Sequence, residues 1–282
     1  MWKCVQLMKH VNLPLIIDET RRLISDSGTG PVMVHTSLPG VMRLGSLSQG
    51  LARHVETIQE MSTGRALWVS AFDDQWISSK RFNVHETPSA IGVINEYYRK
   101  NISKWRTAIP LTSFCGVEDE PFSEASDLPD IYGEESLFSK LVSNDGLILH
   151  YGSGFFDTTF LHHVEQCIAR PLYRFDKNFS GILCDRFGVE RTQTITFHCR
   201  PMDRHLNYDW TGLELELIDA GAVLKIENQL CRIVVISARK MLSYCAEKLM
   251  YDPLCLLDRN SLDWVHPMLD KLGRRFEKED FE

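Results

Sequence analysis

The segment from Leu147 to Glu165 constrains the fold more than any other part of the chain. Its apolar run Leu147–Tyr151 predicts a strand, and Gly152-Ser153-Gly154 predicts a tight turn. A helix is expected from about Thr158, with an apolar stripe made of Phe160, Leu161, Val164 and Ile168. Because ligands of open α/β sheets bind at the carboxyl ends of strands, this turn is a candidate site.

Short apolar segments alternate with amphipathic segments along most of the remaining sequence. This alternation predicts an α/β fold. No internal repeat or low-complexity linker divides the chain, so we expect one α/β domain over residues 1–282. Further helices are expected over Val11–Ser27, Leu47–Met61, Thr87–Lys100 and Val234–Leu249, and further strands over Val32–His35, Arg65–Ser70, Thr192–His198 and Ala222–Ile226.

Charge and composition narrow the class of protein. The formal net charge is -7, whereas a general nucleic-acid binder is usually basic. No apolar run reaches the roughly 18 residues of a membrane span, and His10 and Asn12 interrupt any signal-peptide core. The eight cysteines include no C-x-x-C pair, so we interpret them as reduced thiols. We therefore expect a cytoplasmic protein without nucleic-acid or membrane partners.

His162 and Glu165 are the candidate catalytic pair. They stand three residues apart on the expected helix and therefore share one face. A carboxylate beside an imidazole fixes its tautomer and raises its basicity, as a general base requires. The same spacing is more often a solvated surface pair, and that alternative stays open on spacing alone.

Two other kinds of site are not supported by this segment. His162, His163 and Glu165 do not match the H-E-x-x-H spacing of a helical zinc site, and we expect no metal. Gly152-Ser153-Gly154 is also too short for the G-x-S-x-G turn that presents a nucleophilic serine. These patterns by themselves name no function.

Four blocks of the chain, in order, resemble blocks of the aminoglycoside 3-N-acetyltransferases, the antibiotic N-acetyltransferase family. The family form of the fourth block is asparagine-threonine-x-leucine-histidine-x-alanine-glutamate, and weaker similarity extends the resemblance over roughly residues 15–258. The blocks are Val34–Leu38 with Gly40 and Gly45-Ser46, then Ala66–Phe72, Glu86–Gly92 and Thr158–Glu165.

The resemblance implies a central mixed sheet flanked by helices and transfer of an acetyl group from acetyl-coenzyme A to an amine. It implies that His162 is the general base and that Glu165 acts with it. Thr159 matches a family threonine, and its hydroxyl is a candidate to stabilise the oxyanion of the tetrahedral intermediate. Thr159 would otherwise be an ordinary first-turn residue of the helix.

The same resemblance implies that coenzyme A binds against the first and third blocks. Helix N-termini and hydroxyls suit phosphates and pantetheine amides, and a cation suits phosphate. Ordinary turn, cap and surface roles remain the alternative for these residues. The candidate coenzyme contacts are Ser37, Leu38, Arg43, Ser89 and Gly92.

This chain departs from the family pattern at four positions, which puts the coenzyme contacts and the acceptor pocket in question. Many members have glycine at Ser46, arginine at Ala90, histidine at Ile109 and asparagine at Thr158.

The acceptor is expected to be a small-molecule amine. Residues 107–139 contain no lysine or arginine but eight acidic residues, and an acidic surface would attract a polycationic aminoglycoside. Asp73, Asp74 and Glu118 are the candidate acceptor contacts, although they also suit loop caps and a solvated acidic loop. An aminoglycoside, as in antibiotic resistance, another amino sugar, or a sugar nucleotide of polysaccharide or natural-product assembly all remain open.

The sequence alone leaves two other functions open. The departures motivate a catalytically idle family member that acts as a binding or scaffold protein. A hydrolase that uses His162 to activate water is the other. The sequence allows a homodimer without setting the oligomeric state.

Overall fold

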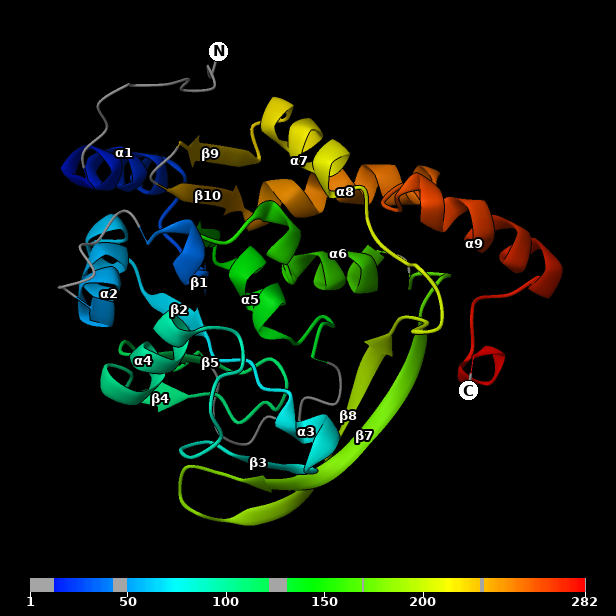
Figure 1. The fold of residues 1–282 in the computed structure, drawn as a ribbon, viewed down its shortest axis with the longest axis horizontal. Coiled ribbons are helices and arrows are strands. Elements are labelled where there is room, and N and C mark those ends of the chain that lie inside the picture. Colours follow the sequence, from blue (N-terminus) through cyan, green and yellow to red (C-terminus); the bar gives the residue numbers. More distant parts are fainter. Residues whose placement is uncertain (1–12, 43–49, 122–130, 169, 229–230, 282) are drawn as a thin grey trace.

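The computed structural model describes residues 13–42, 50–121, 131–168, 170–228 and 231–281. A seven-stranded mixed sheet forms its centre, in the order β4-β5-β2-β1-β6-β10-β9 (Figure 1). Strand β1 pairs in parallel with β2 and β6, whereas β10 and β5 add antiparallel strands on either side. The strands are β1 (Val32–Thr36), β2 (Leu67–Ser70), β4 (Trp105–Arg106), β5 (Phe114–Gly116), β6 (Leu147–Tyr151), β9 (Val223–Glu227) and β10 (Arg232–Ser237).

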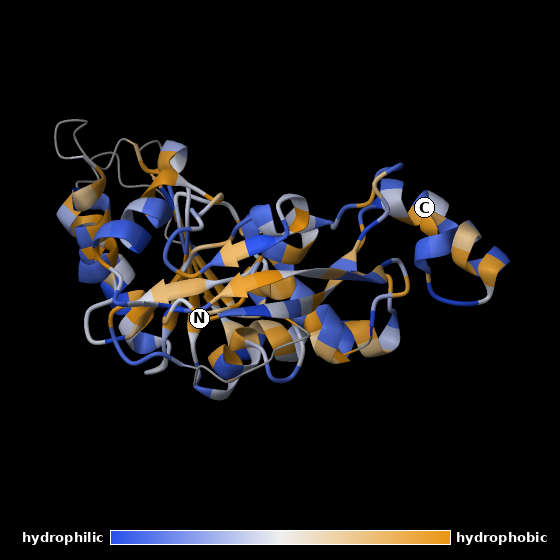
Figure 2. Cartoon of the chain, turned by 90° about the horizontal axis from the view of Figure 1, so that it is seen from below, coloured by the Kyte–Doolittle hydropathy of each residue, from blue (hydrophilic) through white to orange (hydrophobic). Residues whose placement is uncertain are grey.

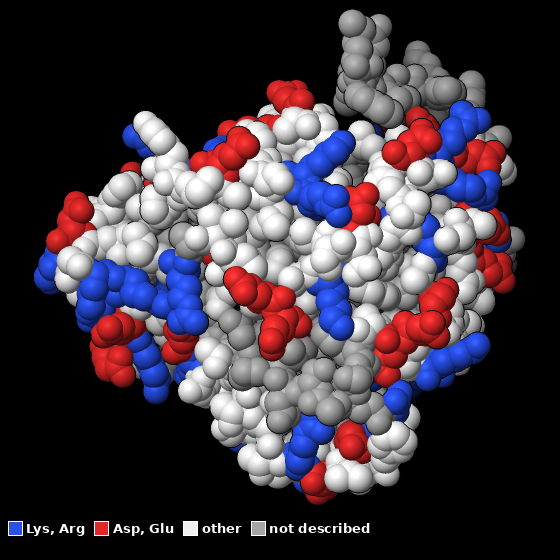
Figure 3. All heavy atoms as spheres, turned by 180° about the vertical axis from the view of Figure 1, so that it is seen from behind, with Lys and Arg blue, Asp and Glu red and all other residues white. Residues whose placement is uncertain are grey.

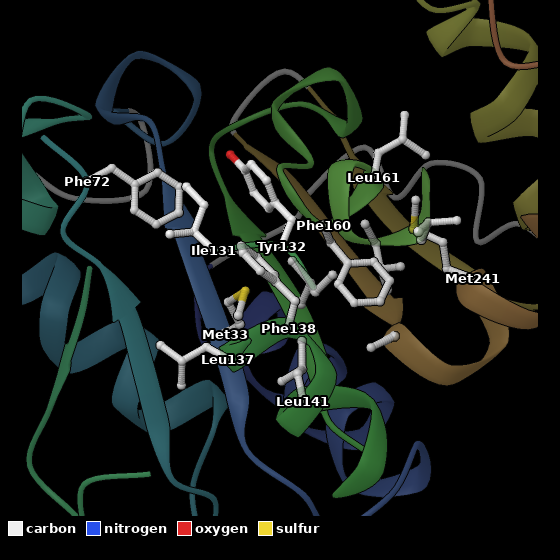
Figure 4. Close-up of a cluster of buried hydrophobic side chains, with 14 of the residues drawn as sticks. Met33, Phe72, Ile131, Tyr132, Leu137, Phe138, Leu141, Phe160, Leu161 and Met241 are labelled. Atoms are coloured by element: carbon white, nitrogen blue, oxygen red, sulfur yellow. The ribbon is translucent and has the colours of Figure 1, made fainter. Parts of the chain in front are cut away.

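Helices cover both faces of this sheet, because alternate residues of the central strands point to opposite sides. Val32 and Val34 of β1 pack with α1 (Leu13–Asp26), α2 (Gly50–Met61) and α4 (Val93–Asn101). Met33 points to the other face and belongs to the cluster drawn in Figure 4, which includes Phe138, Phe160 and Met241. The helices on that second face are α5 (Leu137–Ser143), α6 (Phe160–Ile168) and α8 (Ala238–Tyr251). The expected mixed sheet flanked by helices is confirmed.

A second, three-stranded sheet arches away from the first (Figure 1). It consists of β3 (Arg81–Asn83) and an antiparallel hairpin of β7 (Phe175–Cys184) and β8 (Glu190–Cys199). The remaining elements are α3 (Gln75–Ser78), α7 (Trp210–Asp219), α9 (Arg259–Leu272) and the short helices η1 (Leu38–Gly40), η2 (Phe155–Asp157) and η3 (Lys278–Asp280).

Hydropathy and charge follow this layering. The apolar strands of the main sheet lie between helices of mixed polarity (Figure 2). Acidic and basic side chains are interspersed on the face seen from behind (Figure 3). Among the helices within the described ranges, none has the length and apolar character that crossing a bilayer would require.

Two sequence-based helix boundaries were wrong. The helix expected over Thr87–Lys100 begins only at Val93, because Gly92 takes a φ of 140° that ends any helical path from Thr87. The helix expected over Val234–Leu249 is first strand β10, and helix α8 starts at Ala238. The apolar run from Ile233 to Ile236 is buried throughout, and such a run suits a fully buried strand as well as a helix.

The glycine turn after β6 lies directly against the turn after β1. Gly152 has a φ of 83°, and a Cβ built there would stand 2.1 Å from the Ser37 carbonyl oxygen. A Cβ on Gly40 would stand 1.9 Å from the Gly152 carbonyl oxygen. The Ser37 amide also donates to the Tyr151 carbonyl at 2.9 Å. Two glycines therefore let the carboxyl ends of β1 and β6 meet.

We expect Gly152→Ala to lower the free energy of unfolding by well over about 1 kcal/mol, because the alanine adds backbone strain and a clash with Ser37. Gly221→Ala is the matched control, since Gly221 has a φ of 68° but no described atom within 4 Å of the point where an alanine Cβ would stand. Thermal denaturation of both variants measures the difference. Equal losses of unfolding free energy in the two variants would show that the clash with Ser37 destabilises the protein no further than backbone strain does.

Candidate active site

His162 lies in the first turns of α6, with Nδ1 3.3 Å from Glu165 Oε2 and 3.2 Å from the Tyr208 hydroxyl. A carboxylate only accepts hydrogen bonds, so the neutral imidazole carries its proton on Nδ1. Within the described part of the chain, Nε2 has no hydrogen-bond partner, and 24% of the side chain is exposed. Nε2 is therefore available to accept a proton.

Glu165 is fully buried beneath this histidine. Its carboxylate accepts hydrogen bonds from the Tyr173 and Tyr208 hydroxyls, the latter at 2.8 Å, and lies 3.7 Å from Arg174 Nε. Burial alone would raise the pKa of Glu165, but Arg174, His162 and Tyr173 together lower it to about 2. Glu165 is therefore an anion at neutral pH.

Opposing effects act on the imidazole. Burial and the Arg174 guanidinium lower the pKa of His162, the Glu165 carboxylate raises it, and Arg200 lowers it further. Together these effects place the pKa of His162 below its ordinary value of 6.5. His162 is therefore neutral, and able to act as a base, at pH 7.

His162 borders a cavity of about 480 Å³ at the carboxyl ends of β1 and β6. An adjoining hollow of about 460 Å³ shares Ser37, Ser153, Phe156 and Asp157 with it and continues past Gly152 to Arg232. We call these two spaces together the strand-end groove. Its lining includes the glycine turn, as expected for the carboxyl edge of an α/β sheet.

Two imidazoles stack beside this groove, where His35 belongs to the lining and His150 is fully buried. His35 and His150 have ring centroids 5.1 Å apart, and burial lowers the pKa of His35 to about 4. His150 Nδ1 is 2.9 Å from the Ser153 hydroxyl, and its Nε2 is 3.1 Å from the Thr158 hydroxyl. Both Thr158 and Thr159 line the groove, but the Thr158 hydroxyl is engaged by His150, whereas that of Thr159 has no partner among the described residues.

A second cavity, of about 890 Å³, opens on the other side of His162. Its walls come from β7, from β8 and from the chain that follows β8, so we call it the hairpin cavity. Phe156, His162 and Trp210 border both this cavity and the strand-end groove. The imidazole therefore lies between two spaces that can each hold a small molecule.

Of the five expected coenzyme residues, the structure places one, Ser37, at the groove. Ser37 lines both of its parts. Gly92 caps α4 beside Thr36, Ser89 donates its amide to Glu96 at 2.8 Å, and Leu38 lies in η1, but none of these three lines the groove. Arg43 and the departure at Ser46 lie outside the described residues.

The expected acceptor contacts are not brought to His162. Asp73 is buried, and its two oxygens accept from the amides of Trp76 at 3.0 Å and Leu111 at 2.9 Å. Asp74 is exposed at the start of α3. Glu118 accepts from the amide of Leu67, at the end of β2 away from the groove. None of the three acidic residues lines either cavity.

The other two departures from the family pattern lie in or beside the packed interior. Ile109 belongs to the core cluster, and the Ala90 amide donates to the Phe72 carbonyl at 2.8 Å.

Sequence patterns missed the partners of Glu165. Tyr173 and Arg174 follow α6 in the chain, and Tyr208 lies 43 residues beyond Glu165. An arginine close to a candidate catalytic carboxylate was the one available signal, because a buried carboxylate needs a counter-ion. Within the described ranges, no cluster of three or more His, Cys, Asp or Glu residues is arranged to hold a metal ion.

Comparison with solved structures finds the same fold with low sequence identity. AAC-IIIb in a binary complex with coenzyme A (CoASH) matches with a TM-score of 0.66 and 19% identity, over 86% of this chain and 97% of that one. AAC-VIa bound to sisomicin matches with a TM-score of 0.65 and 21% identity, over 83% and 97%. The apoenzyme of the aminoglycoside acetyltransferase AAC(3)-IVa matches with a TM-score of 0.66 and 17% identity, over 90% and 94%.

No curated protein sequence matches this chain. A sequence profile described as aminoglycoside 3-N-acetyltransferase, however, matches residues 33–250, which include the turns after β1 and β6, helix α6 and the β7–β8 hairpin. The chain therefore belongs to the aminoglycoside 3-N-acetyltransferase family.

Proposed function

We propose that this protein transfers an acetyl group from acetyl-coenzyme A to the amine of an aminoglycoside or another amino sugar, with His162 as the general base. The observation that carries the proposal is the position of His162 between two cavities, with Nδ1 held by Glu165 and Nε2 unpartnered among the described residues. A two-substrate transfer needs a base that both substrates reach.

The reaction begins with attack of the amine nitrogen on the thioester carbonyl carbon, while Nε2 of His162 takes a proton from that nitrogen. The carbonyl oxygen becomes an oxyanion, and the Thr159 hydroxyl at the groove is the candidate donor to it. Collapse of the intermediate forms the amide and breaks the carbon–sulfur bond. The imidazolium then returns its proton to the departing coenzyme thiolate.

The strand-end groove suits the coenzyme, because Ser37 and the glycine turn form its wall. The complex of AAC-IIIb with CoASH supports acetyl-coenzyme A as the co-substrate, and sisomicin bound to AAC-VIa supports an amine acceptor. Acetyl-coenzyme A is an intracellular metabolite, which favours the cytoplasm as the place of the reaction. An aminoglycoside acceptor would make the protein an antibiotic-resistance enzyme.

We expect His162→Ala to lower kcat by about 10²–10⁴-fold, the usual contribution of a general base, with little change in coenzyme affinity. Thiol release from acetyl-coenzyme A in the presence of aminoglycosides and amino sugars measures the rate, and calorimetry measures coenzyme binding. His85→Ala, on the exposed surface, is the matched control.

Turnover of His162→Ala close to that of the wild type would remove His162 from the mechanism. No thiol release by the wild type with any acceptor, together with no coenzyme binding, would favour a binding or scaffold role instead.

The dependence of kcat/KM on pH tests whether Glu165 sets the pKa of His162. Only neutral His162 is active, so we expect kcat/KM to rise with pH along a limb centred below 6.5 and then level off. Glu165 raises the pKa of His162, so Glu165→Gln should move this limb to lower pH and lower the plateau. Tyr173→Phe is the control, since it removes a bond to Glu165 and leaves the contact with His162. An unchanged limb in Glu165→Gln would contradict coupling of the pair.

The role of the Thr159 hydroxyl is tested by Thr159→Val and Thr159→Ser. Loss of one oxyanion donor usually lowers kcat by about 10²–10³-fold, so we expect that loss in the valine variant and near wild-type kcat in the serine variant. Equal kcat in both variants would assign the oxyanion to another donor.

A further inference from the structure

The hairpin cavity has an unusual charge for a site that would receive a polycationic acceptor. Three cationic side chains line it, namely Arg174, Lys177 and Arg200. Among its described lining residues Asp203 is the single carboxylate, and that carboxylate is paired with Arg204 at 2.7 Å. Glu165, behind His162, is already compensated by Arg174. With these pairs set aside, Arg200 remains on this lining as a positive charge that no carboxylate among the described residues balances.

Arg200 is the cation best suited to contact a ligand. It follows β8 directly, is exposed, and donates from Nη1 to the Leu206 carbonyl at 3.1 Å. No carboxylate among the described residues pairs with it. Arg200 also acts on His162 electrostatically, after burial and Arg174, in lowering the pKa of the imidazole. A guanidinium without a counter-ion in the described ranges thus lies at the cavity wall within electrostatic reach of the base.

Aromatic side chains form much of the remaining wall. Phe179 and Phe197 come from the hairpin, and Tyr208 and Trp210 come from the chain before and within α7. The Tyr208 and Trp210 rings meet edge to face with centroids 5.0 Å apart. Flat apolar walls of this kind accept the face of a sugar ring or a nucleobase.

Charge complementarity decides between the acceptor classes that the proposed function allows. An ammonium group of a polycationic aminoglycoside would meet the like charge of Arg200 here, and like charges across a binding surface disfavour a partner. An arginine that is not already engaged by a carboxylate instead offers paired N–H donors, which suit the oxygens of phosphate.

We propose that the hairpin cavity binds an amino sugar that carries a phosphate group, either a free sugar phosphate or a nucleotide-linked sugar, with the phosphate held by Arg200 and the amine presented to His162. This proposal rests on the proposed function for the acetyl transfer and adds the chemical class of the acceptor. The cavity volume of about 890 Å³ is within the range of small-molecule sites.

The experiment compares kcat/KM for glucosamine, glucosamine 6-phosphate, UDP-glucosamine and sisomicin, by thiol release from acetyl-coenzyme A. We expect one phosphate-bearing acceptor to exceed glucosamine by about 10–100-fold, the contribution of one charge-assisted hydrogen bond. The two phosphate-bearing probes distinguish a sugar phosphate from a nucleotide-linked sugar.

Arg200→Glu should lower the ratio of kcat/KM for the phosphate-bearing acceptor to that for glucosamine by about tenfold or more, and raise kcat/KM for sisomicin. Arg239→Gln is the matched control, because Arg239 is an exposed arginine at the start of α8 and lines neither cavity. It should leave the ratio unchanged. Preference of the wild type for sisomicin, with no response to Arg200→Glu, would overturn the proposal.

Calorimetry with saturating coenzyme A separates this proposal from the proposed function. Binding of glucosamine 6-phosphate or UDP-glucosamine that weakens in Arg200→Glu, without any thiol release, would sustain the acceptor site and refute the transfer. Competition of these ligands with coenzyme A, together with weaker coenzyme binding in Arg200→Glu, would assign Arg200 to the coenzyme and overturn the acceptor proposal.

Discussion

The buried Glu165 carboxylate is the constraint on which the rest of the site depends. An unpaired buried anion would be expelled or protonated, so three groups from other parts of the chain must meet it. Arg174 arrives from the start of the hairpin, and the Tyr173 and Tyr208 hydroxyls donate to its oxygens. Removing one partner of a buried ion pair typically costs about 3–5 kcal/mol. The carboxylate therefore ties α6, the hairpin and the chain before α7 together around His162.

Local patterns predicted the parts of the structure that local physics determines. The alternation of strands and helices, the glycine turn and the shared face of His162 and Glu165 all follow from spacing within about twenty residues. The partners of Glu165 could not be predicted in this way, because the contact with Tyr208 joins residues 43 apart. For Asp73 the local pattern suggested too much. Its carboxylate lies just after a strand, as a ligand contact would, but it accepts hydrogen bonds from two backbone amides instead.

The two cavities would allow one imidazole to serve the two substrates of the proposed transfer. His162 and Trp210 border both the strand-end groove and the hairpin cavity, so a thioester in one and an amine in the other could both reach the imidazole. Burial and the nearby arginines lower the pKa of His162 and favour the neutral imidazole, while Glu165 raises that pKa and would stabilise the imidazolium that the proposed attack forms. A general base needs both effects on its pKa, because it must be unprotonated before the reaction and must still accept a proton readily in the transition state.

The pair His162–Glu165 and the lining of the hairpin cavity around Arg200 are separable parts of this molecule. Glu165 uses Arg174 as its counter-ion, so changes of charge farther along the hairpin need not disturb the carboxylate. Arg200 directly follows that hairpin and lines the cavity, where its charge can act on a ligand that enters. A family fold fixes the base but leaves the pocket to the side chains that line it. An acceptor with phosphate is therefore compatible with a family whose solved members include a complex with sisomicin.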